Sequence, residues 1–170
     1  MTELIHSVEA VFTQDEENVL NANYSYYYIP LYQRGYKWTS NQIIKLLEDI
    51  NNFERQPGKF YCVQNITLVP NKEKKCYNVV DGQQRLTTMS LLLSVLDASE
   101  LVEKKLQFPE NSIRHYTNKF VKNWIIGDAD LPDSWDEFIA HDNNYDHQDI
   151  YHLFSGYKTI EKWFTTNEVS

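Results

Sequence analysis

One continuous stretch, residues 76–96, constrains the fold more than any other part of the chain. A β-prone run from Cys76 to Val80 stops at Asp81-Gly82, and a segment that is apolar on nearly every side begins at once. This order is typical of a strand, a tight turn and a buried helix. The polar residues 81–85 then fall at a helix N-terminus, where unpaired N–H groups and the helix dipole attract anions, phosphates above all.

The composition is that of an ordinary folded protein with one substantial core. The chain has 170 residues, of which 42% are apolar and 14% aromatic, so a disordered chain is excluded. The first residues have no signal-peptide pattern, and the longest apolar-rich run is shorter than the about 20 residues that span a bilayer. We therefore expect a soluble, cytoplasmic protein without a membrane partner.

The net charge of −8 is unevenly distributed along the chain. Residues 1–95 hold almost equal numbers of basic and acidic side chains, whereas residues 96–170 hold 14 Asp and Glu against seven Lys and Arg. Binding to duplex DNA depends largely on neutralising phosphates. The acidic second half therefore argues against a chain that grips duplex DNA by itself.

The periodicity of apolar residues divides the chain into two parts. Up to residue 98 it predicts helices over residues 4–12 and 39–53, and strands over residues 24–30, 60–69 and 76–81. Thr39 and Gln42 fit a capping box at the start of the second helix. After residue 98 the pattern becomes helical, so we predict an α/β domain over residues 1–98 and a helical region over 99–170, the start of a larger helical domain.

Two polar stretches each place an amide beside a guanidinium, Tyr32-Gln33-Arg34 and Gln83-Gln84-Arg85. Arginine offers a planar fork of donors that matches phosphate oxygens, so two convergent arginines indicate a polyphosphate ligand. Gly82 would let the backbone approach that ligand closely.

The neighbouring residues suggest the remaining roles. Asp81 would hold a divalent cation, for which we expect Mg²⁺, or orient the attacking water, and Gln83 or Gln84 would position that water. An aromatic wall of Tyr32, Tyr36 and Trp38 would stack on a base.

Each role has a simpler alternative. Asp81 and Gln84 also fit a plain capping box, and Arg34 and Arg85 are open to solvation or to pairing with a carboxylate such as Glu48 or Asp49. The aromatic residues would then pack in the core or at its rim and not stack on a base. The C-terminal histidines lie among aspartates, but their spacing matches no metal-ligand pattern; they are His141, His147 and His152.

Two motifs resemble a known family. Residues 29–38, Ile-Pro-Leu-Tyr-Gln-Arg-Gly-Tyr-Lys-Trp, and residues 79–88, Val-Val-Asp-Gly-Gln-Gln-Arg-Leu-Thr-Thr, are similar to the two signatures of the N-terminal domain of GmrSD-type modification-dependent restriction enzymes. The resemblance covers residues 1–100 firmly. It implies an α+β fold: a ParB/sulfiredoxin-like core with a small mixed sheet and packed helices, followed by an all-helical C-terminal part.

The resemblance also implies a function in defence against phage. It implies that a nucleoside triphosphate is bound and hydrolysed through the Asp-Gly-Gln-Gln-Arg motif, here residues 81–85, and that the hydrolysis regulates a DNA nuclease. The first signature adds nucleotide-binding positions, which are Tyr32, Gln33, Arg34, Tyr36 and Trp38. Many relatives have Gly-Ser where this chain has Gln64-Asn65, which we expect to alter or narrow the nucleotide pocket.

Two other functions compete with this one. The domain would be a sensor or interaction module that binds a nucleotide or modified DNA without turnover, or it would itself cut DNA as a ParB-like nuclease. DNA would be reached through the full-length protein or through a nuclease domain that has no counterpart in these residues. Self-association into a homo-oligomer is also compatible with the sequence.

Overall fold

The protein, for which we analysed a computed structural model, combines six α-helices with one four-stranded mixed sheet in its described residues, which are 5–13, 24–96, 105–110, 114–127 and 130–167. This is the predicted α+β class. The elements are α1 (Val8–Phe12), β1 (Tyr26–Tyr28), α2 (Ser40–Asn51), β2 (Thr67–Asn71), β3 (Cys76–Asp81), α3 (Gln83–Val95), β4 (Lys105–Gln107), α4 (His115–Phe120), a π-helical turn (Val121–Ile125), α5 (Trp135–His141), a 3-10 turn (Asn143–Tyr145) and α6 (Gln148–Thr166).

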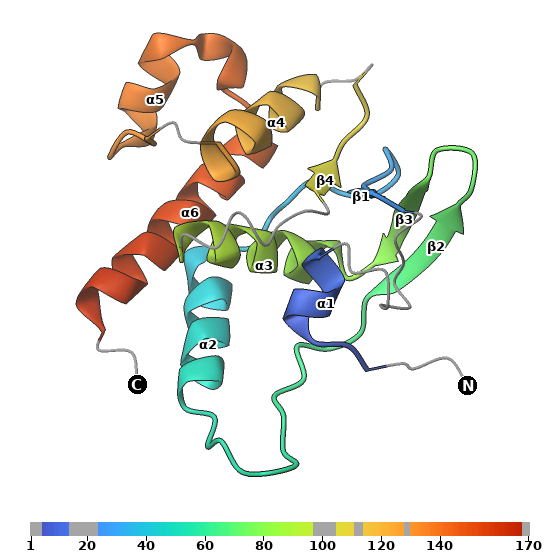
Figure 1. Ribbon diagram of the computed structural model, residues 1–170. Coiled ribbons are helices and arrows are strands. Elements are labelled where there is room, and N and C mark those ends of the chain that lie inside the picture. Colours follow the sequence, from blue (N-terminus) through green and yellow to red (C-terminus); the bar gives the residue numbers. More distant parts are fainter. Residues whose placement is uncertain (1–4, 14–23, 97–104, 111–113, 128–129, 168–170) are drawn as a thin grey trace.

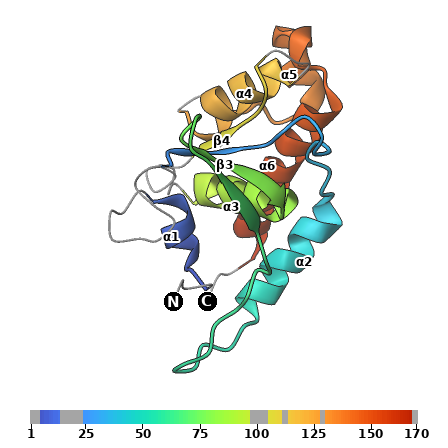
Figure 2. The same ribbon diagram turned by 90° about the vertical axis from the view of Figure 1, so that its right-hand side faces the viewer.

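The sheet has the strand order β2-β3-β1-β4. β2 and β3 form an antiparallel hairpin, and β1 runs parallel to both β3 and β4. The helices α1 and α3 lie below β1 and β4 in Figure 1 and in the 90° view of Figure 2, and the β2–β3 hairpin extends down beside α3. Tyr27 on β1 faces this side, because its ring contacts Phe12 of α1 and Tyr77 of β3.

The core continues from the sheet into the helical half of the chain. Helix α6 packs against both α2 and α3, and its Gly156 lies beside Leu91, Ile43 and Tyr36. The predicted capping box at the start of α2 is present, with the Thr39 N–H donating to Gln42 Oε1 at 2.9 Å. The predicted boundary between two domains, at residues 98 and 99, lies outside the described residues and stays a prediction.

Two segments differ from the predicted pattern. Residues 60–66 form no strand, because their neighbour β3 ends at Asp81, the partner of Thr67, and leaves the preceding residues nothing to pair with. Conversely, the short strand β4 lies in the part predicted to be helical. Its three residues are too few to produce a period-two signal.

The helix predicted over residues 4–12 is shorter in the structure, where α1 begins at Val8. No helix in the described ranges is long and apolar enough to cross a membrane.

Candidate functional site

The turn between β3 and α3 requires a glycine. Gly82 is the N-cap of α3 and has φ +86°, and a Cβ atom there would lie 3.0 Å from both Asn65 O and Ile66 Cα. A glycine N-cap has no side chain to accept from the first turn, so the first N–H groups of α3 keep their hydrogen-bonding capacity. The predicted capping box of Asp81 with Gln84 is therefore wrong, because the helix begins one residue later and the Gln84 amide bonds elsewhere.

The loop that packs on Gly82 is itself unusual. Gln64 has φ +80°, in the left-handed region that favours glycine. The resemblance described above places a glycine at this position in many relatives. The side chains of Gln64 and Asn65 are exposed, and their effect on a nucleotide pocket stays a prediction.

The Gln84 amide joins the two motifs. Its Oε1 accepts from Lys37 N–H at 2.8 Å, and its Nε2 donates to Gly35 O at 3.0 Å. One helical turn later, Thr88 Oγ1 donates to Gln84 O and lies 2.9 Å from the Tyr36 hydroxyl. The oxygen and the nitrogen of the Gln84 amide thus both hold the loop of residues 29–38 against α3.

The adjacent Gln83 has no such contacts. Gln83 is only 3% exposed, and neither its Oε1 nor its Nε2 has a hydrogen-bond partner in the part of the chain that the structure describes. The buried hydroxyls of Thr87 and Ser90 are also unpartnered, and the spacing of i, i+4 and i+7 places all three on one face of α3. An unsatisfied buried polar group costs about 1–3 kcal/mol, so this face of α3 carries a free-energy cost that partners for these atoms would relieve.

The two predicted arginines are free of ion pairs. Arg34 is exposed and Arg85 is half-buried, and the ion pairs among the described residues involve other cations. Neither arginine pairs with Glu48 or Asp49, so solvation is the simpler alternative that stays open. Arg34 precedes Gly35 and Arg85 follows Gln84, so the two arginines lie on segments that the hydrogen bond from the Gln84 side-chain amide to Gly35 O joins.

A third arginine, which the sequence did not single out, supports the first motif. Arg114 is buried, and its guanidinium donates to Gln33 O at 2.7 Å and Pro30 O at 3.4 Å, while its Nε lies 3.2 Å from Asp149 Oδ2. Asp149 in turn fills the space beside Gly35, where a Cβ atom would lie 1.8 Å from its Oδ1. No local pattern could reveal this pair, because its members lie far from the motif in sequence.

Gln33 ties the same loop to the sheet. Its Nε2 donates to Val80 O at 2.6 Å. With the contacts of Gln84 and Arg114, this bond fixes the backbone on both sides of Arg34. The predicted nucleotide-binding residue Gln33 therefore has a structural contact of its own.

The three aromatic residues of the first motif lie in different environments. Tyr32 is 72% exposed, whereas Tyr36 is 1% exposed, and burial raises its pKa well above the ordinary value. Trp38 is partly buried against the core. Tyr36 therefore packs in the core, whereas the Tyr32 ring is accessible for stacking with a base.

Asp81 ends β3 with an exposed side chain beside the N-terminus of α3. No group of three or more His, Cys, Asp or Glu side chains that could hold a metal occurs among the described residues. A single carboxylate fits Mg²⁺ if the remaining ligands are phosphate oxygens and water, as is usual for this ion. The predicted cation site thus depends on a phosphate ligand.

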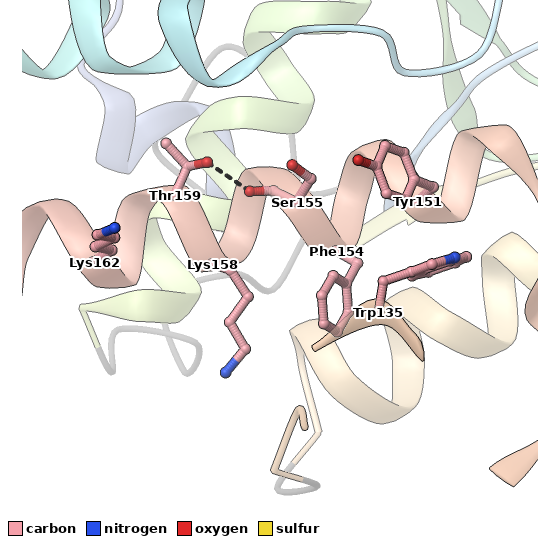
Figure 3. A pocket seen from close by; sticks show the side chains of 7 residues that line it. All are labelled: Trp135, Tyr151, Phe154, Ser155, Lys158, Thr159 and Lys162. Atoms are coloured by element: carbon pink, nitrogen blue, oxygen red, sulfur yellow. Dashed lines mark hydrogen bonds between the residues drawn. The ribbon is translucent and has the colours of Figure 1, made fainter. Parts of the chain in front are cut away.

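A separate hollow of about 270 Å³ lies between α5 and α6 (Figure 3). Trp135, Phe154 and Tyr151 line one end of it. At the other end Lys158 is engaged by Leu131 O and Glu161, and the Thr159 hydroxyl donates to Ser155 O. Because these polar groups are satisfied and none of the lining residues belongs to the two motifs, we do not assign this hollow a ligand.

Comparison with known proteins identifies the family. Neither the curated proteins nor the solved structures contain a match. The family described as the GmrSD restriction endonuclease, N-terminal domain, matches residues 12–169, which include the helical half as well as the two motifs. The chain therefore belongs to the family of GmrSD restriction endonuclease N-terminal domains.

Proposed function

We propose that this domain binds a nucleoside triphosphate where the two motifs meet, hydrolyses it, and thereby regulates DNA cleavage. The observation that carries the proposal is the Gln83 amide, which is buried without a partner in the first turn of an α3 that has no side-chain cap. Arg85 lies in that turn, Arg34 precedes the Gly35 that the Gln84 amide bonds, and neither arginine has an ion pair among the described residues. Family membership makes the chain part of a restriction system, and the nucleotide chemistry is the part that we propose.

The phosphates would be bound by fixed donors. The N–H groups at the start of α3 supply hydrogen bonds and the positive end of the helix dipole, and Gly82 admits the ligand close to the backbone. Arg34 and Arg85 then bind phosphate oxygens from the two sides of the Gly35–Gln84 hydrogen bond. Because hydrogen bonds fix the loop around Arg34, little ordering remains when the ligand binds.

The reacting end would be served by Asp81 and Gln83. Asp81 would hold Mg²⁺ together with the phosphates, and the ion would neutralise charge on the oxygens. The Gln83 amide, which has both a donor and an acceptor available, orients the attacking water. We assign Gln84 to holding the loop, since both ends of its amide are engaged, and Tyr32 to stacking on the base.

Phosphate release in the presence of Mg²⁺ tests the proposal. Each of the four common ribonucleoside triphosphates is supplied to the wild type and to Arg34→Ala, Arg85→Ala and Asp81→Asn. Removing one preorganised donor to a developing anion typically lowers a rate by about 10²–10³-fold, and we expect losses of this order from the arginine variants.

Arg55→Ala serves as the matched control, because Arg55 is an exposed arginine outside both motifs. Its rate should equal that of the wild type. Equal rates in all five proteins would contradict the proposal. Calorimetric binding of a triphosphate without product would support a sensor instead, and nicking of plasmid by this domain alone would support the nuclease alternative.

A further inference from the structure

The face of the sheet that points away from α1 and α3 carries aromatic side chains on its central strand. Tyr26 and Tyr28 alternate with the buried Tyr27 along β1, so they occupy this second face. Both are half-buried. The Lys74 ammonium lies 4.7 Å from the centroid of the Tyr28 ring, so a ring and a cation stand together on this face.

One row of the second face is accessible across all four strands. Val69, Asn78, Tyr28 and Gln107 are register partners and form one row over the sheet. Val69 is 48% exposed, Gln107 is exposed, and Val80, next to the row on β3, is 41% exposed. Solvent therefore reaches this row from one edge of the sheet to the other.

One end of this face is basic, although the chain as a whole is acidic. The turn between β2 and β3, residues 72–75, holds three lysines and one glutamate in a protein of net charge −8. The lysines are Lys72, Lys74 and Lys75, and their side chains are exposed. The folded chain thus places positive charge beside the half-buried tyrosines, which a division of the sequence into halves conceals.

We propose that this face binds single-stranded nucleic acid. Bases stack on aromatic rings while lysines track the backbone, and this combination binds single strands with little sequence preference. On this face Tyr28, and beside it Tyr26, would receive bases. The exposed Lys74 side chain would move from the Tyr28 ring to a phosphate, and the other turn lysines would extend the contact.

A duplex fits this surface less well, because its bases are already stacked on one another and offer the tyrosines no free face. A second copy of the chain fits less well for a different reason: two such faces would bring like charges together. The proposal concerns residues outside the candidate nucleotide site, so it stands or falls independently of triphosphate hydrolysis.

Fluorescence anisotropy with a labelled oligothymidylate of about 12 nucleotides, within the site size of such surfaces, tests the proposal. The wild type should bind saturably and more weakly as salt is raised. Tyr28→Ala should bind about tenfold more weakly, and Tyr28→Phe, which keeps the ring, within about twofold of the wild type. Lys74→Gln should lower the slope of log K against log salt by about 0.7.

Lys119→Gln is the matched control, because Lys119 lies 5.1 Å from the ring centroid of Tyr116 in a similar pair on α4. It should bind like the wild type, and thermal unfolding of each variant verifies that it is folded. The proposal is overturned if the wild type does not bind, if Lys119→Gln and Lys74→Gln have equal effects, or if a duplex binds as tightly as the single strand. Sedimentation showing a dimer that Tyr28→Ala dissociates would also overturn it.

Discussion

Two faces of α3 are buried alike and yet differ in their hydrogen bonding. On one face, Gln84 and Thr88 bond to the loop of residues 29–38. On the other, Gln83, Thr87 and Ser90 bury polar atoms that have no hydrogen-bond partner among the described residues. Burial alone cannot account for the difference, since both glutamines are less than a tenth exposed. Two adjacent glutamines of one motif therefore differ in their surroundings: Gln84 holds the loop of residues 29–38, and Gln83 is the one that we propose acts on a ligand.

The largest loss of stability is expected from Arg114, which bonds the same loop of residues 29–38 that Gln84 and Thr88 hold. Arg114→Ala should lower the free energy of unfolding by about 3 kcal/mol, because it leaves the largely buried Asp149 and two loop carbonyls without their cation. Urea denaturation measures the loss. Arg114→Lys keeps the charge but not the planar guanidinium, so its free energy of unfolding should lie between those of the wild type and Arg114→Ala. A loss below about 1 kcal/mol would mean that the loop is held without Arg114.

The glutamine pair should respond with opposite signs. Gln84→Leu should destabilise the protein by about 2 kcal/mol, because Gly35 O and Lys37 N–H lose their partner. Gln83→Leu, the same substitution one residue earlier, should stabilise it by about 1 kcal/mol, because it replaces an unsatisfied amide with an apolar group of similar size. Equal losses from both variants in urea would remove the distinction between the two faces.

The threonine pair sharpens the comparison on a smaller scale. Thr88→Val should cost about 1 kcal/mol, because the buried Tyr36 hydroxyl loses its bond, whereas Thr87→Val should be neutral or slightly stabilising. Valine has nearly the shape of threonine, so packing is matched in the two variants. Differential scanning calorimetry should place the Thr87→Val midpoint at or above that of the wild type, and a midpoint below that of Thr88→Val would contradict the account.

Local pattern predicted much of the fold. β3, α2 and α3 follow from periodicity and turn residues, and the α2 capping box is confirmed. The strand predicted over residues 60–69 is wrong before Thr67, because a β-prone sequence still needs a partner strand, and Gln64 takes a left-handed conformation there. The sequence did not predict β4, because its pairing with β1 joins residues more than 75 positions apart in the chain.

The candidate site was predictable in its location but not in its division of labour. The sequence places Gln83 and Gln84 side by side, yet a step of one residue on a helix turns a side chain by about 100° and sends it to a different neighbour. Likewise, Arg114 and Asp149 carry no motif, and only the packing of α4 and α6 brings them to the first signature. Tyr36 was predicted to stack on a base, but its contacts with Thr88 and Gly156 place it in the core.

The most direct measurement is phosphate release by Gln83→Leu, compared with the wild type at saturating triphosphate and Mg²⁺. The account predicts a protein that unfolds at higher temperature and releases phosphate at least about 100-fold more slowly, because the substitution removes the unsatisfied amide on which the site depends. A Gln83→Leu variant with the wild-type rate would contradict the account.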